Sequence, residues 1–530
     1  MRFAVAICLF CVGTPALATG AIYTGDTVRD RARAGASVAS ERSVSALSTN
    51  PGLLGKTDNF ELQLSTTWLS DRSEITRKGP FTTQAFRDDN PDLANQLDGT
   101  MNSAAFASSL GKATSAYSTQ LLRLGVSYGF GTSGFRIAGT LSDLPVQNHQ
   151  YDTGGPVRYR LIGSDDRVRQ ISAGLGWAGR SFGIGAAVHI NRVRRARRVM
   201  LSAADREALS NNGLYLERAF DDYVVDAVGT LQHSPQAGFG LWLAPFGKME
   251  IGFAMQLASE GTSEAGDAQL DVSAISTEQS GAIFARTRPA AEPGIPSTVA
   301  GNAASIRDGL PMRIRAGFRY QFERWDLEAE WRMEQWSGAT LLGITANSIP
   351  GSVFFIPDPT DAQNQVPLGD FGDGSGRSFL DAQSYHVASR IWLLPDGIAL
   401  HVGYAMENPA TEQPDAAWID GLRHNIGVGL SLIDRGYAID AGYLMVLGAQ
   451  NTIENGNLRP KNPRLGEAPD PAETDQLTVQ NNGDYQMVTS FFGLGLRADV
   501  GAFRETKAAE RKAWYRVWTK GAPSFGRGGL

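Results

Sequence analysis

Residues 311–337 read PMRIRAGFRYQFERWDLEAEWRMEQWS, and apolar and polar side chains alternate along them with a period of two. The apolar positions are Met312, Ile314, Ala316, Phe318, Tyr320 and Phe322, and then Leu327, Ala329, Trp331 and Met333. Most positions between them hold arginine or glutamate. Alternation over this length predicts two β-strands, each with an apolar face and a charged face.

The charged positions also predict how these two strands pair. A two-residue loop at Glu323 and Arg324 joins them into an antiparallel hairpin. The aligned pairs are then Phe322–Trp325, Arg319–Glu328, Arg313–Glu334 and Arg315–Arg332. Two of these pairs join opposite charges, which favours this register, and glutamates lie diagonally across from the paired arginines.

Two classes of β-protein fit this hairpin. In a soluble sandwich the apolar face is the core, whereas in an outer-membrane barrel it contacts lipid and the charges line the lumen. The start of the chain favours the barrel, because residues 1–18 are typical of a cleaved secretory signal with Arg2, an apolar run and a final Ala-Leu-Ala. Both cysteines, Cys8 and Cys11, lie in this segment, so the exported chain is expected to lack disulfides and thiolate metal sites.

The rest of the sequence narrows the choice between a soluble sandwich and an outer-membrane barrel. No later stretch approaches ~18 consecutive apolar residues, so the sequence predicts no transmembrane helix. A closed barrel is the other structure that crosses lipid with its backbone hydrogen bonds satisfied. A formal net charge of −6 argues against nucleic acid as a partner.

From Asn59 onward the chain repeats a pattern of strand, tight turn, strand and long polar loop. The predicted strands cover about residues 59–70, 117–130, 135–144, 168–177, 181–193, 239–244, 248–259, 312–322, 325–335, 384–394, 398–407, 422–433 and 437–447, with a last strand from about Tyr485. They predict an all-β fold, a transmembrane antiparallel β-barrel of about 14 strands with periplasmic turns and extracellular loops. Connections 260–310, 339–380 and 449–484 are expected to be external loops.

The barrel is expected over residues 59–503. Two segments outside it differ from the barrel strands in sequence pattern. Residues 19–58 lack alternation and are rich in small side chains. They are expected to form a plug, or hatch, inside the lumen, with a flexible leader as the alternative. Residues 504–530 are basic and aromatic, which is typical of a short helix at the membrane interface or of a disordered tail.

Four stretches are similar to a known family. They are residues 45–52 (SALSTNPG), 181–188 (SFGIGAAV), 310–311 (LP), and 397–404 (GIALHVGY) followed by 407–409 (ENP). In this order and spacing they resemble the FadL family of outer-membrane transporters for long-chain fatty acids and hydrocarbons. The resemblance implies a barrel with this number of strands, an N-terminal hatch, a hydrophobic ligand captured outside, and lateral exit through a gap that a kink in the third strand causes.

The resemblance also assigns a hatch motif. Asn50, Pro51 and Gly52 correspond to the family's Asn-Pro-Ala, with glycine in place of alanine, and Leu53 follows. This turn is expected to meet the ligand or the wall gap, or else to be an ordinary turn before the first strand. The chain continues past the usual terminal aromatic, and Phe503, the candidate signal for the barrel assembly machinery, breaks the parity of the last strand.

The third strand carries the candidate lateral opening at Gly139, Ser142, Asp143 and Pro145. Glycine weakens packing in a strand and proline cannot donate to its ladder. A broken ladder in a membrane wall is costly unless it borders water or protein. We therefore expect this stretch to border a wall gap, with the alternative that Pro145 only ends the strand at the external rim.

A cluster of arginines follows where the fifth strand is expected to leave the membrane. Its members are Arg192, Arg194, Arg195 and Arg197, with Arg198 beside them. Guanidinium groups pair bidentately with phosphates and carboxylates. The cluster is expected to contact lipopolysaccharide phosphates or incoming carboxylates, or alternatively to be a solvated rim.

The sequence contains no catalytic or metal-binding pattern that we can assign. The six histidines are scattered, and neither an HExxH nor a GxSxG motif occurs. His189 and His401 are expected to be hydrogen-bonding groups of the lumen, and the charged residues of the first hairpin are expected to be lumen-wall structure. The prediction is a non-enzymatic outer-membrane transporter of a Gram-negative bacterium, without cofactor or metal. Its expected partners are a hydrophobic small molecule, membrane lipid, lipopolysaccharide and the barrel assembly machinery; the alternative is a scaffold or shuttle protein of the same fold that serves secretion or surface assembly.

Overall fold

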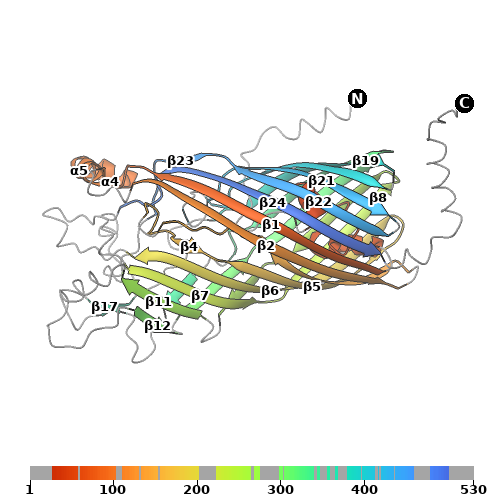
Figure 1. The fold of residues 1–530 in the computed structure, drawn as a ribbon, viewed down its shortest axis with the longest axis horizontal. Helices are drawn as coiled ribbons and strands as arrows, with labels where there is room; N and C mark the ends of the chain where they lie inside the picture. Colours follow the sequence, from red (N-terminus) through yellow and green to blue (C-terminus); the bar gives the residue numbers. More distant parts are fainter. Residues whose placement is uncertain are drawn as a thin grey trace, which may run out of the picture.

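In the part of the chain that the structure describes, fourteen antiparallel wall strands form a closed barrel (Figure 1). The first strand, β1 (Phe60–Arg77), pairs with β2 (Gly111–Gly129) on one side and with the last strand, β24 (Gly483–Asp499), on the other. Closure removes the free sheet edge that lipid would leave unsatisfied. This computed structural model describes residues 25, 27–57, 60–102, 110–130, 133–152, 155–201, 223–263, 268–274, 298–301, 304–339, 343–346, 355–357, 365–367, 379–395, 397–411, 416, 419–434, 436–458 and 478–499.

The remaining wall positions follow in chain order, and several consist of more than one strand segment. They are β3 (Phe135–Leu144), β5 (Arg167–Ala178), β6 (Phe182–Leu201), β7 (Tyr223–His233) with β8 (Gln236–Phe246), β9 (Met249–Gln256) with β10 (Ser259–Thr262) and β11 (Ala268–Ala274), β12 (Thr298–Gly301) with β13 (Ala304–Leu310) and β14 (Met312–Gln321), β15 (Trp325–Gln335) with β16 (Gly343–Ala346), β19 (Ala382–Leu394), β20 (Ile398–Glu407), β21 (Arg423–Asp434) and β22 (Tyr437–Gly448). Shorter segments are β4 (Gly163–Ser164), β17 (Phe355–Pro357), β18 (Gln365–Pro367) and β23 (Asn451–Ile453). The predicted signal segment and C-terminal tail lie outside the described residues.

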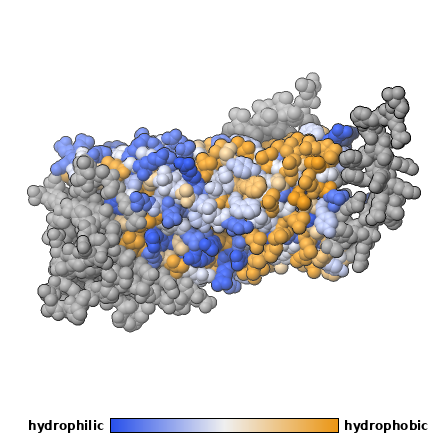
Figure 2. Space-filling view, viewed as in Figure 1, coloured by the Kyte–Doolittle hydropathy of each residue, from blue (hydrophilic) through white to orange (hydrophobic). Residues whose placement is uncertain are grey.

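Wall side chains alternate between two environments. Outward-facing ones are large and apolar over a belt near the end with the tight turns, where Figure 2 shows hydrophobic surface. Members of this belt include Leu62, Leu64, Leu124, Ile171, Ile184, Leu430 and Phe492. Inward-facing side chains are mostly polar and buried, as Thr67, Glu328 and Asn425 illustrate. This arrangement is that of a barrel in lipid, and it is the reverse of a soluble sandwich.

The register predicted for the first hairpin is confirmed. Strands β14 and β15 pair Arg319 with Glu328 and Arg313 with Glu334, and Arg315 faces Arg332. At the tight turn the rings of Phe322 and Trp325 stack with centroids 3.8 Å apart. The charged faces of both strands point into the lumen.

The wall strands extend further outward than the sequence pattern predicts. Residues 260–310, which we expected to be an external loop, contain β10 to β13, so that expectation is wrong. With 18 residues, β1 spans ~59 Å at ~3.3 Å per residue, about twice the ~25 Å apolar belt of such barrels. Beyond the belt a wall strand no longer needs an apolar outer face, so alternation disappears although the ladder continues.

Helices lie inside the barrel and at its far end. The connection between β1 and β2 carries α4 (Gln84–Asp89) and α5 (Pro91–Met101), which pack through Phe81, Phe86 and Leu97. In the described part of the chain, every helix is too short or too polar to cross a membrane.

Candidate functional site

Residues 27–57 lie inside the barrel and are enclosed by its wall (Figure 1). This stretch, the N-terminal segment, contains α2 (Val28–Ala32), α3 (Ala46–Thr49) and the 3-10 helix η1 (Pro51–Lys56). Lys56 donates to the Gly179 carbonyl at 2.7 Å and Arg136 donates to the Thr57 carbonyl at 3.2 Å. Because both wall residues lie beside tight turns, the segment blocks the tight-turn end of the lumen.

The turn at Asn50 ties the N-terminal segment to the wall. The Asn50 side-chain nitrogen donates to the Val38 carbonyl at 2.8 Å and to the Leu241 carbonyl of β8 at 3.0 Å. Its side-chain oxygen accepts from the Gly52 amide at 3.0 Å, which caps η1. Leu53 is fully buried and belongs to an apolar cluster with Trp242. The four predicted hatch residues therefore lie together, against the wall.

Glycines of the wall receive this turn. The glycine socket consists of Gly176 on β5, Gly183 and Gly185 on β6, and Gly240 on β8. A Cβ atom at Gly185 would lie 2.1 Å from the Pro51 carbonyl oxygen, and one at Gly240 would lie 2.2 Å from the Asn50 side-chain oxygen. A Cβ atom at Gly52 would itself lie 2.9 Å from the Gly240 carbonyl. The turn and the wall are thus in backbone contact, which accounts for glycine at position 52.

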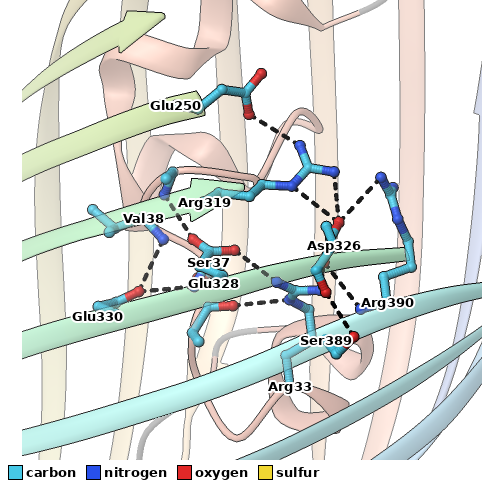
Figure 3. A network of polar contacts seen from close by, with 12 residues as sticks. Arg33, Ser37, Val38, Glu250, Arg319, Asp326, Glu328, Glu330, Ser389 and Arg390 are labelled. Atoms are coloured by element: carbon cyan, nitrogen blue, oxygen red, sulfur yellow. Dashed lines mark hydrogen bonds and ion pairs between the residues drawn. The ribbon is translucent and has the colours of Figure 1, made fainter. Parts of the chain in front are cut away.

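Three carboxylates of β15 hold the middle of the N-terminal segment (Figure 3). We call Asp326, Glu328 and Glu330 the carboxylate row; all three are buried and point into the lumen. One Glu330 oxygen accepts the amides of Ser37 at 2.8 Å and Val38 at 2.9 Å. Glu328 accepts the amide of Ala39 at 2.8 Å.

Arg33 adds charge to this attachment. Its guanidinium donates to Glu328 at 2.7 Å and to Asp326 at 3.2 Å. On the wall side, Arg319 donates to Asp326 at 2.6 Å and to Glu250 at 3.0 Å (Figure 3). Buried ion pairs of this kind add little net stability but are costly to break, because the remaining partner is left as an unpaired buried charge.

The arginines of the first hairpin complete the attachment. Arg315 donates to Glu330 at 2.7 Å and to the Gly35 carbonyl at 3.1 Å. Arg332 donates to the same glutamate at 2.5 Å and also to the Gly35 carbonyl. Gly35 has a φ of +91°, and a Cβ there would lie 2.7 Å from the Arg332 guanidinium. These charges, which we expected to be wall structure, therefore bind the N-terminal segment.

The other end of the lumen holds a second inward-folded stretch, residues 146–152 and 155–162, which we call the strap. Its buried members include Val146, Gln147, Asn148, His149, Tyr151, Val157, Arg158, Leu161 and Ile162. Tyr151 and His149 lie 3.0 and 3.2 Å from the Ser73 hydroxyl of β1, and Gln147 donates to the Ile419 carbonyl at 3.0 Å. The strap thus folds inward against β1 and the connection before β21, and no periodic pattern in its sequence indicates this.

The third strand is paired with β5 through its length and with β2 from Arg136 to Ser142. Its ladder with β2 runs unbroken to Ser142, and its ladder with β5 runs unbroken from Phe135 to Leu144. Gly139 keeps its backbone partners on both sides, so the ladder is continuous at this position, and the lateral opening stays a prediction. Strand β3 ends at Leu144, directly before Pro145.

The seam between β2 and β3 ends one residue after Ser142. Residues 111–122 of β2 continue outward with no partner on β3. The Asp143 carboxylate instead accepts the Leu122 amide at 3.2 Å and an Arg169 hydrogen bond at 2.9 Å. Asp143 thus closes the point where the two strands separate.

Two empty spaces lie near these elements. A cavity of about 60 Å³ inside the lumen is lined by Ser48, Thr49, Pro51, His189, Gln256, Arg313, Arg315 and Arg332 among others. It has room for roughly two waters at ~30 Å³ each, far below the ~300 Å³ of small-ligand sites. An open apolar groove of about 600 Å³ lies over the neighbouring strands β24, β1, β2 and β3, lined mainly by Leu62, Leu64, Leu124, Val126, Gly139, Leu141 and Leu496.

The predicted arginine cluster is divided between the two faces of β6. Arg195 and Arg197 point inward, where both bind Asp166, at 2.8 and 2.7 Å. Arg192 and Arg194 point outward with Arg198. Arg194 donates to Asp165 at 2.5 Å. Burial raises the pKa of Asp165, but hydrogen bonds from Arg194 and Arg167 outweigh it and hold that pKa below its ordinary value.

The lumen histidines have hydrogen-bond partners. His189 lies 2.8 Å from the Ser172 hydroxyl, and His401 lies 2.8 Å from the Ser431 hydroxyl. Among the described residues, no three histidine, cysteine, aspartate or glutamate side chains are arranged to hold a metal ion.

Solved structures share this architecture. The chain is similar to a FadL homologue of Pseudomonas aeruginosa, with a TM-score of 0.66 and 15% identity over 91% of this chain and 100% of that one. It is also similar to the P. putida toluene transporter TodX (TM-score 0.56, 12% identity, 89% and 98% covered) and the Ralstonia pickettii toluene transporter TbuX (0.53, 11%, 90% and 99%). No protein-family model and no curated protein matches the sequence. The fold is therefore that of the FadL-type barrels.

Proposed function

From this shared fold and the N-terminal segment held inside the lumen, we propose that the protein is a passive transporter of the Gram-negative outer membrane for long-chain fatty acids or similar hydrophobic molecules. Relatives in fold are described as a FadL homologue and as toluene transporters. The observation that carries the proposal is the N-terminal segment, which is held across the lumen by the carboxylate row and the glycine socket. A purely structural barrel has no need of a closure attached by charges.

A 60 Å³ interior cavity is too small for a fatty acid. Transport therefore requires the N-terminal segment or the strap to move, and movement is easier for a plug bound by polar groups, because water replaces their hydrogen bonds. The 50–52 turn is one of the parts of the segment that lie in direct backbone contact with the wall.

The apolar groove supports lateral release. It lies on the lipid-facing side, and one sheet separates it from the lumen. Asp143 marks the outer end of the seam between β2 and β3, where its hydrogen bond to the Leu122 amide replaces the ladder, so separation of the two strands would begin there. A hydrophobic ligand that leaves here enters the membrane without crossing water.

Uptake of labelled oleate tests the proposal. Cells that lack their own transporter would carry either the complete protein or a variant without residues 48–53. The complete protein is expected to restore uptake, and the deletion is expected to change it. Absence of uptake with a folded, surface-exposed barrel would contradict fatty-acid transport, and repetition with labelled toluene would then decide between ligand classes.

A further inference from the structure

Outward-facing side chains of β5 and β6 change from apolar to basic within one row of the sheet. Going outward, the facing pairs are Ala173–Val188, Ile171–Ile190, Arg169–Arg192 and Arg167–Arg194. Ile171 and Ile190 belong to the exposed apolar belt, with 55% and 38% of their surface accessible. The arginines therefore begin where the belt ends, at the height of the lipid head groups.

These four outward-facing arginines carry more positive charge than the carboxylates beside them neutralise. Two arginine pairs face each other directly across the ladder, which is unfavourable without an intervening anion. Asp143 binds Arg169 at 2.9 Å, and Asp165 binds both Arg167 and Arg194. Four arginines against two aspartates leave an excess of two positive charges. Within the described residues, the Arg192 side chain has no hydrogen-bond or ion-pair partner.

We propose that Arg167, Arg169, Arg192 and Arg194 bind the phosphate groups of lipopolysaccharide, the phosphorylated glycolipid of the outer leaflet. Guanidinium groups bind phosphate oxygens bidentately, and four of them on one flat face suit a lipid that carries more than one phosphate. The lipid's acyl chains then lie over the apolar residues below, including Ile171 and Ile190. The inference rests on outer-membrane placement and is independent of what the lumen transports.

The position of the cluster favours a lipid over a soluble anion. The side chains point away from the lumen and are highly accessible, so a ligand in transit meets the inward pair Arg195 and Arg197 instead. Those two are already neutralised by Asp166 and Asp308. The free positive charge is thus on the membrane side.

Arg192 is the residue to change, because its replacement removes no internal contact. The full-length protein would be purified in detergent as wild type, Arg192→Gln and Arg192→Glu. Arg72→Gln and Arg72→Glu on β1 are the matched controls, since Arg72 is also exposed and outward-facing but lies opposite Ala116 and Val488. Lipopolysaccharide binding would be measured by native mass spectrometry and by the rise in Tm on titration.

Arg192→Gln is expected to weaken binding roughly tenfold, which corresponds to ~1.4 kcal/mol, and Arg192→Glu is expected to weaken it further. Both Arg72 variants should bind as wild type does. Dephosphorylated lipopolysaccharide should bind wild type no better than intact lipopolysaccharide binds Arg192→Glu. Equal binding by the Arg192 and Arg72 variants would overturn the proposal, as would an equal Tm rise with inorganic phosphate or with phosphatidylglycerol vesicles. Oleate uptake by the same variants separates this site from the transport function.

Discussion

Positions 185 and 240 hold glycine because the backbone of another segment occupies the space where a side chain would be. The turn at residues 50–52 lies on them, and the Asn50 side chain donates across the gap to the Leu241 carbonyl. Each contact is between groups of fixed geometry, so the fit depends on the absence of single methyl groups. At the residue scale the closed state is therefore sensitive to the smallest substitutions.

Replacement of Gly185 by alanine is expected to displace the turn, because the new Cβ would lie 2.1 Å from the Pro51 carbonyl oxygen. Overpacking of this kind costs about 1–3 kcal/mol, which raises the open population roughly 5- to 150-fold. The measurement is the rate at which a thiol reagent labels a Leu53→Cys variant, since Leu53 is fully buried in the closed state. Gly247→Ala is the control, because a Cβ there meets nothing within 4 Å. Equal labelling rates in the two variants would contradict this account.

Arg33 and Glu328 are expected to be coupled. Arg33→Gln leaves the buried Glu328 without its ion-pair partner, at a cost of about 3–5 kcal/mol. Glu328→Gln leaves Arg33 with Asp326 as its remaining partner and is expected to cost less, whereas the double variant removes both charges. The rate of labelling at Leu53→Cys should therefore rise in each single variant. Expressed as free energies, the effects of the two single variants together should exceed the effect of the double variant. Lys78→Gln, which breaks an exposed pair with Asp484, is the control. Strictly additive effects would show that the ion pair does not hold the segment.

At the scale of elements, lipid contact decides what the sequence can predict. The hairpin of β14 and β15 could be predicted with its register, because its outer face must be apolar within the belt and its inner face carries complementary charges. Strands β10 to β13 could not be predicted. Beyond the apolar belt the outer face of the wall does not contact lipid, so nothing imposes an alternation of apolar and polar side chains. The strap was missed for a related reason: its inward position depends on the Ser73 hydroxyl and the Ile419 carbonyl, distant in sequence, and not on local periodicity.

The candidate site was predictable only in part. The Asn50-Pro51-Gly52 turn is visible because proline and glycine fix its geometry, but its partner glycines lie on three different strands. The carboxylate row was visible as charge alternation, while its binding to the amides of residues 37–39 depends on tertiary packing. Composition alone cannot distinguish wall charges that pair with each other from those that hold a plug.

Strand β3 offers a test of lateral release. Gly139→Leu is expected to fill the outer groove while leaving the ladder intact, because a Cβ at Gly139 has only the Ser172 carbonyl nearby, at 3.6 Å. If the ligand leaves through this groove, oleate uptake should fall about tenfold, the effect of ~1.4 kcal/mol of lost ligand contact. Ala173→Leu adds similar bulk on the neighbouring strand outside the groove. Unchanged uptake in both variants would exclude the groove as the exit.

At the scale of the whole molecule, two inward-folded segments lie along one lumen. The N-terminal segment lies at the tight-turn end, where it contacts Gly179, and the strap lies at the opposite end, where it contacts Ser73 and Arg77. We expect each of them to act as a closure of its end. They share no helix or strand, although Ala34 of the N-terminal segment belongs to the same apolar cluster as Tyr151, Val157 and Leu161 of the strap. When two closures lie in series, the tighter one limits passage through the lumen. Opening one end alone therefore leaves the other end to exclude ions and polar solutes.

This arrangement predicts synergy between the two ends. Leu161→Ala should loosen the strap, since loss of a fully buried leucine side chain costs about 2–5 kcal/mol. In planar bilayers, Leu161→Ala and Gly185→Ala should each conduct little more than wild type, whereas the double variant should conduct far more than the sum of the two. Leu257→Ala on the lipid-facing surface replaces Leu161→Ala in the control pair. If Gly185→Ala alone conducted as well as the double variant, the strap would not be a barrier, and the N-terminal segment would close the lumen by itself.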